Sequence, residues 1–227
     1  RVTTMLPALA QSLPIAIGIL VSSLPLTMIP LILRTRSDGR ALAMFLAGWT
    51  TGFLLVGVAV LLLADTLGPS PDGPSNWVNW VRVVLGVLLL WLAFKQWRGR
   101  PRNGEAAALP GWMSSMETMT PWRAAGLGLL LASLNPKYTV LIASGVLGIA
   151  TATYQFGAQL GALAVFTLVS SLGVFAPLWL SWALGEKAVA PMEAFKAWLV
   201  RNNAIIMASV LLVLGAVVLG NGVSGLL

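Results

Sequence analysis

One lysine, Lys137, lies near the middle of a long apolar stretch, directly after Asn135 and Pro136. Burying an amine in the hydrocarbon core of a membrane costs at least ~2.5 kcal/mol on insertion scales, so such a residue is a candidate functional site. Proline removes a backbone donor and disfavours helix at the residue before it. Asn135 can then cap a second half-helix that begins at Pro136. The motif predicts a helix N-terminus beside a lysine, which together attract anions inside the membrane.

The alternative explanation of this motif is a proline kink whose lysine side chain reaches a membrane interface. Many apolar residues lie on each side of Lys137, so both interfaces are distant and we favour a functional role. Hydroxyl and proline residues also occur together in the first apolar stretch, where an ordinary kinked helix explains them equally well. The predicted substrate-binding residues are Lys137, Asn135, Pro136, Ser133, Ser22, Ser23, Pro25 and Thr27.

The residues required for metal binding, disulfide formation or catalysis are missing from this chain. Cysteine and histidine are absent, which excludes disulfides and the usual zinc ligands. No Asp or Glu lies deep within an apolar stretch, and neither a nucleophile–base pair nor a phosphate-binding loop is found. We therefore predict that the protein is not an enzyme and has no catalytic residue, cofactor or metal site.

The composition is that of a membrane protein. Of 227 residues, 58% are apolar and 9% charged, whereas soluble domains are roughly one quarter charged. Six apolar stretches are long enough to cross a hydrocarbon core of about 30 Å. We predict an all-α integral membrane protein of six transmembrane helices, of which the first and fourth are broken. The predicted spans are residues 6–33, 41–64, 77–94, 123–150, 154–184 and 204–226.

Basic residues gather in three of the connecting loops, at 34–40, 95–123 and 185–203. The positive-inside rule places these loops in the cytoplasm and both termini outside, in a bacterial inner membrane. Anionic headgroups explain the net charge of +7 better than nucleic acid, so we expect no nucleic-acid partner. Residues 187–201 have an amphipathic pattern, which predicts an interfacial helix, with a plain extension of the last span as the alternative.

The two halves of the chain contain a weak internal repeat. Gly18 and the Ser-Leu-Pro sequence at 23–25 recur, at a constant offset for the glycine and serine, as Gly128 and Ser-Leu-Asn-Pro at 133–136. The second and fifth stretches share a Gly-xxx-Gly spacing, at residues 48–52 and 157–161. Such small-residue spacings also serve close helix packing, which is compatible with a repeat.

Each repeat contains three spans, an odd number, so the second copy must insert upside down relative to the first. Inverted repeats with broken helices near the membrane midplane are a recurring design of secondary transporters. The predicted units are a first repeat at 1–98, a cytoplasmic linker at 99–122 and a second repeat at 123–227, within one membrane domain.

Longer stretches around these motifs carry a family resemblance: SLPL at 23–26, FLAGW at 45–49, SLNPK at 133–137, LGEK at 184–187 and WLVRNN at 198–203. The chain resembles the peptidoglycolipid-addressing, or sulfolipid-addressing, family of actinobacteria within the lysine-exporter superfamily. That superfamily contains exporters of amino acids and other small solutes, while this branch is associated with moving complex glycolipids toward the cell envelope. The first-half counterpart of Asn-Pro-Lys is Ser-Leu-Pro, so the resemblance does not imply a symmetric pair of sites.

Three functions are compatible with these observations. The first is an inner-membrane transporter or flippase that assists export of a glycolipid-like substrate with an anionic or polyhydroxylated headgroup. The second is a small-solute exporter of the amino-acid type, and the third is a non-transporting scaffold subunit of a lipid-export complex. Few polar residues are present to line a solute cavity, which favours the lipid. The expected partners are the bilayer and this substrate, with a homodimer or a larger export machine left open.

Overall fold

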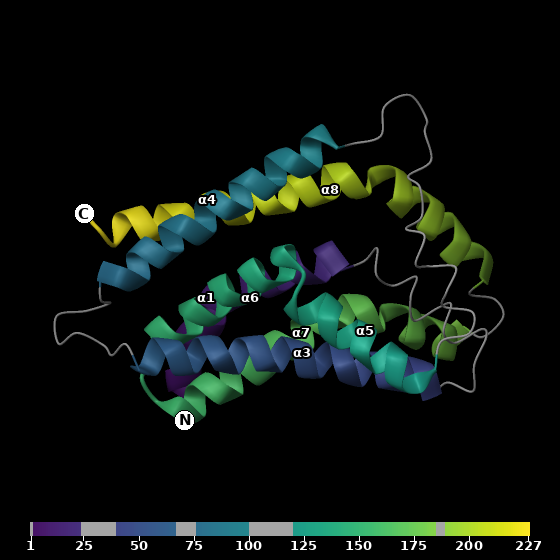
Figure 1. Cartoon of the computed structure of the whole chain (residues 1–227), viewed down its shortest axis with the longest axis horizontal. Helices are drawn as coiled ribbons and strands as arrows, with labels where there is room; N and C mark the ends of the chain where they lie inside the picture. Colours follow the sequence, from purple (N-terminus) through teal and green to yellow (C-terminus); the bar gives the residue numbers. More distant parts are fainter. Residues whose placement is uncertain (1, 24–39, 67–75, 100–119, 185–188) are drawn as a thin grey trace.

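The protein is a bundle of long apolar helices (Figure 1). The computed structural model describes residues 2–23, 40–66, 76–99, 120–184 and 189–227, and within these ranges it contains helices and no strand. This agrees with the predicted all-α class. The helices are α1 (Val2–Ser23), α3 (Arg40–Thr66), α4 (Asn76–Arg98), α5 (Pro121–Ser133), α6 (Pro136–Ala152), α7 (Phe156–Leu184) and α8 (Val189–Ser224).

Five of the described helices, α1, α3, α4, α7 and α8, are long and apolar enough to cross a membrane. Helices α5 and α6 pass the same test together, and a bend of 61° separates them, so they add a sixth span if the pair is one broken span. The break predicted within residues 123–150 is therefore present. Helix α1 ends at Ser23, and the predicted break near Pro25 lies outside the described residues. These apolar helices make the chain a multi-pass membrane protein.

The last helix is longer than the sequence analysis predicts. Helix α8 contains 36 residues, from Val189 to Ser224, which corresponds to about 54 Å at 1.5 Å per residue. The segment 185–203, predicted as a loop, is helical from Val189 onward and continues without interruption into the final span. The plain extension of the span is thus the form observed, because no proline or glycine interrupts the helix between residues 192 and 214.

The helices form two packed groups (Figure 1). Helix α4 lies along α8, while α1, α3, α5, α6 and α7 make up the other group. Within that group α3 packs on α5, and α1 packs on both α6 and α7. Contacts of α1 with α8 and of α4 with α6 join the groups, and the two chain ends lie at the same end of the bundle.

Glycines allow two of these helix pairs to approach until their backbones touch. A Cβ atom added to Gly52 of α3 would lie 2.7 Å from the carbonyl oxygen of Leu129 in α5. A Cβ added to Gly86 of α4 would lie 2.6 Å from the backbone nitrogen of Leu219 in α8. Close approach at small residues is typical of membrane helix pairs, where van der Waals packing replaces the hydrophobic driving force.

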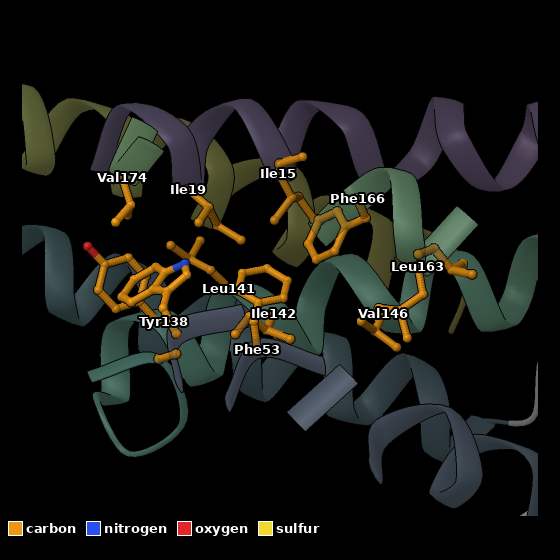
Figure 2. Packing of buried hydrophobic residues seen from close by; sticks show 14 of the residues in the cluster. Ile15, Ile19, Phe53, Tyr138, Leu141, Ile142, Val146, Leu163, Phe166 and Val174 are labelled. Atoms are coloured by element: carbon orange, nitrogen blue, oxygen red, sulfur yellow. The ribbon is translucent and has the colours of Figure 1, made fainter. Parts of the chain in front are cut away.

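Large buried side chains fill the centre of the five-helix group (Figure 2). The rings of Trp49 and Tyr138 meet edge to face with centroids 5.2 Å apart, and those of Phe53 and Phe166 are 5.6 Å apart. All four side chains are at most 1% exposed. Ile19 of α1 lies beside this layer (Figure 2). The layer holds the first turn of α6 against α1, α3 and α7.

Candidate functional site

The break between α5 and α6 follows the local sequence. Helix α6 begins at Pro136, whose ring suits the first helical position, and Asn135 Oδ1 accepts a hydrogen bond from the backbone N–H of Lys137 at 3.1 Å. The Oγ1 atom of Thr139 lies 2.8 Å from the carbonyl oxygen of Ser133 and 3.0 Å from that of Asn135. The carbonyl group of Ser133, which the break releases, therefore finds a donor within the bundle, as backbone groups in a membrane must.

The side chain of Lys137 joins the start of α6 to the end of α1. Its Nζ donates to the backbone oxygen of Ser22 at 3.1 Å and lies 3.6 Å from Sδ of Met207 in α8. The same ammonium group is 4.3 Å from the ring centroid of Tyr138, within range of a cation–π interaction. The side chain is partly buried, and in the described part of the chain no carboxylate pairs with it. Its positive charge there lacks a counter-charge.

Tyr138 uses the same acceptor as Lys137. Its hydroxyl donates to the backbone oxygen of Ser22 at 3.0 Å, and the side chain is 1% exposed. Ser22 belongs to the last described turn of α1, and its carbonyl oxygen is the acceptor of both hydrogen bonds. One cation and one hydroxyl therefore satisfy this carbonyl, using both of its lone pairs.

The hydroxyl groups of Ser22 and Ser133, two of the three predicted serines, do not face the lysine. Ser22 Oγ donates to the carbonyl of Ile19 at 3.0 Å, and Ser133 Oγ donates to the carbonyl of Leu129 at 2.7 Å. Each bond lies within the serine's own helix, a common arrangement for hydroxyls in apolar surroundings. Ser22 therefore contributes its backbone oxygen to the site, where the sequence analysis expected its side chain.

The structure brings together five of the eight predicted site residues. Four lie at the break between α5 and α6, and Ser22 approaches them from α1. Pro25 and Thr27 lie outside the described residues, as does the side chain of Ser23. The five are Lys137, Asn135, Pro136, Ser133 and Ser22.

Three neighbours of the lysine are absent from the sequence prediction: Tyr138, Thr139 and Met207. The two hydroxyl residues follow Lys137 directly, and a buried hydroxyl in a membrane span requires an acceptor, so a sequence signal exists for both. Met207 is 3% exposed and comes from α8. No local pattern identifies it, because only the packing of α8 against α1 brings it near.

The groups gathered at this site can bind a charged ligand. Within the described residues, no group of three or more His, Cys, Asp or Glu side chains could hold a metal ion. What the site offers is an ammonium group, an aromatic face and the positive end of α6 at one position. These features favour a negatively charged group.

Comparison with known families matches this chain to one family model. The model is described as SfLAP: Sap, sulfolipid-1-addressing protein, and it matches residues 13–224. The matched range includes the break, Lys137 and its partners on α1 and α8. No curated protein and no solved structure gives a match.

Proposed function

The chain belongs to the family of Sap, the sulfolipid-1-addressing protein, and from this premise we propose that it is an inner-membrane transporter or flippase for an anionic lipid. The family implies a lipid-related role in the membrane, and Lys137 carries the finer proposal. Its ammonium group lies inside the bundle at a broken span, without a counter-charge in the described part of the chain. A sulfate or phosphate headgroup would supply that negative charge.

The present partner of Lys137 is one that a headgroup can replace. A hydrogen bond between an ammonium group and an anionic oxygen is stronger than one to a neutral carbonyl. When Lys137 turns away, Tyr138 still donates to the Ser22 carbonyl. The exchange therefore avoids the ~1–3 kcal/mol that a buried carbonyl without any donor costs.

The helix contacts support the proposal of two inverted repeats. In the proposed repeat, α1 corresponds to α5–α6, α3 to α7 and α4 to α8. Under this correspondence the α1–α7 contact matches the α5–α3 contact, and the α1–α8 contact matches the α6–α4 contact. The contacts α1–α6, α3–α7 and α4–α8 are unchanged by it. The α6–α7 contact lacks a counterpart of similar extent among the described residues, in which α1 ends at Ser23. A broken span at the interface of two such halves is typical of secondary transporters.

The aromatic residues of α4 support the proposed membrane position. Trp80 and Trp97 are 60% and 47% exposed, and they are about 26 Å apart along the helix at 1.5 Å per residue. That separation is close to the thickness of a hydrocarbon core, at whose boundaries tryptophan is enriched. Lys95 and Arg98 lie in the last turn of α4, and we assign this end of the helix to the cytoplasm by the positive-inside rule. Both termini then lie outside.

Reconstitution into liposomes tests this function. The substrates are a fluorescent sulfated glycolipid, an uncharged glycolipid with the same label, and radiolabelled amino acids. Wild-type protein should translocate the sulfated lipid, and Lys137→Ala should slow it at least about tenfold, as expected for loss of one charge-assisted contact worth ~1.4 kcal/mol. Lys95→Ala, which removes an exposed lysine at the end of α4, is the matched control and should retain the wild-type rate.

The possible results of this assay distinguish the flippase, the solute exporter and the scaffold. Transport of amino acids without lipid movement would contradict the flippase and support a solute exporter. Lipid movement that is unchanged in Lys137→Ala would contradict the role of the lysine. An inactive wild-type protein, with lipid export in cells still dependent on it, would support the scaffold.

A further inference from the structure

A second cation points into the bundle at the opposite end of α6. Arg82 of α4 is partly buried, and its Nη2 donates to Oγ1 of Thr151 in α6 at 2.6 Å. Trp80, two residues earlier, is 60% exposed and marks the outward face of α4. The guanidinium group thus contacts another helix, whereas a residue serving only as an interfacial anchor would extend toward the headgroups.

The charge of Arg82 is uncompensated in the part of the chain that the structure describes. Thr151 is its hydrogen-bond partner there, and no carboxylate pairs with it. A guanidinium group has five N–H donors in a planar fork. One hydrogen bond to a neutral hydroxyl leaves most of these donors available to a ligand.

A buried amide with an unused acceptor lies one turn before Arg82. Asn79 is 2% exposed, its Nδ2 donates to the carbonyl oxygen of Gly225 at 2.7 Å, and its Oδ1 has no partner among the described residues. A Cβ added to Gly222 of α8 would lie 3.0 Å from the Cβ of Arg82, so α8 closes one side of this region. Asn79 and Gly222 thus close the α8 side of Arg82, and the spare donors of its guanidinium group remain for the anionic oxygens of a headgroup.

The two cations lie at opposite ends of one helix. Lys137 is in the first turn of α6 and Thr151, the partner of Arg82, is in its last turn. At 1.5 Å per residue these positions are about 21 Å apart along the axis, most of a hydrocarbon core of about 30 Å. A charged headgroup that moves along α6, from the break in the middle of the span to the extracytoplasmic end, would thus meet a cation at each end of this helix.

We propose that Arg82 is a second binding station for a sulfate- or phosphate-bearing lipid headgroup, at the extracytoplasmic end of α6. This inference rests on the proposed function, since it extends the path that begins at Lys137. The fork of Arg82 binds the anionic oxygens, and Thr151 holds the guanidinium in place while the station is empty. The headgroup leaves the outer station into the outer leaflet.

Counting bound lipids tests this station without measuring transport. Full-length protein in detergent is titrated with sulfoquinovosyl diacylglycerol or phosphatidylglycerol, and native mass spectrometry gives the number of lipids retained, with phosphatidylcholine as the background. Wild-type protein should retain two anionic lipids above this background. Arg82→Gln and Lys137→Gln should each retain one, and the double variant none. Arg98→Gln removes an exposed charge from the same helix and should retain two.

The outcomes distinguish this inference from the proposed function. Two lipids on Arg82→Gln and one on Lys137→Gln would overturn the outer station and leave the inner one intact. One lipid on Arg82→Gln and two on Lys137→Gln would support the outer station and contradict the proposed role of Lys137. If thermal unfolding shows that Arg82→Gln is misfolded, Arg82→Lys replaces it. That variant keeps the charge but loses the fork, so it should bind the second lipid about tenfold more weakly, and wild-type affinity would overturn the assignment.

Discussion

Two helix crossings in this bundle carry the same Gly-xxx-Gly spacing and use it differently. In the α3–α5 crossing, a Cβ added to Gly48 would collide with the backbone of Ala125. In the α1–α7 crossing, a Cβ added to Gly161 would meet the end of the Met5 side chain at 2.8 Å, and Gly157 has no described atom within 4 Å of such a Cβ. One crossing is closed by backbone against backbone, and the other by a flexible side chain that can move.

This difference distinguishes a fixed part of the site from an adjustable one. The glycines hold α5 directly on α3, so the position of the break has little freedom. The end of α1 depends instead on the hydrogen bonds that Lys137 and Tyr138 donate to Ser22. We infer that, when a headgroup draws Lys137 away, the end of α1 is held by Tyr138 alone and is loosened, while α5 remains in place.

The largest expected effect belongs to Gly48→Ala. The new methyl group must push α3 and α5 apart, and overpacking of this kind costs about 1–3 kcal/mol. Thermal unfolding in detergent micelles, followed by helical circular dichroism, should show a clear loss of stability. A melting temperature equal to that of wild type would contradict the backbone contact.

A smaller effect is expected from Tyr138→Phe, which removes one of the two donors to Ser22. The loss of one buried hydrogen bond costs about 1 kcal/mol, and Lys137 still satisfies the carbonyl. Combining it with Lys137→Met should cost more than the sum of the two single changes, because the carbonyl then loses both of the donors that the structure describes. Strictly additive losses in the same unfolding assay would show that the two side chains do not share this acceptor.

The smallest effects should come from the glycines of α7. For Gly161→Ala the tip of Met5 turns aside, and we expect a change within about 0.5 kcal/mol. Gly157→Ala is the matched control, since alanine favours a helix over glycine by up to about 1 kcal/mol and has room here. Equal losses at positions 48 and 161 would abolish the contrast between the two crossings.

The break in the fourth span could be predicted from sequence because its causes are local. Pro136 disfavours helix at the preceding residue, and the side chain of Asn135 reaches the N–H of Lys137 two residues on. These effects act within a few residues, whichever helices pack around them.

The partners of Lys137 could not be predicted because they come from distant parts of the chain. Met207 and the carbonyl of Ser22 reach the lysine only through the packing of α8 and α1. The Gly-xxx-Gly spacing likewise indicates a close crossing without showing which of two copies makes it. At position 48 the neighbouring helix presents backbone, and at 161 it presents a side chain.

The central claim is that a positive charge at position 137 moves an anionic headgroup across the membrane. Its most direct test is the initial translocation rate of a fluorescent sulfated lipid in liposomes containing wild type, Lys137→Met, Lys137→Arg or Lys95→Met. We predict at least about a tenfold lower rate for Lys137→Met, partial activity for Lys137→Arg and the wild-type rate for Lys95→Met. A wild-type rate for correctly folded Lys137→Met would contradict the account.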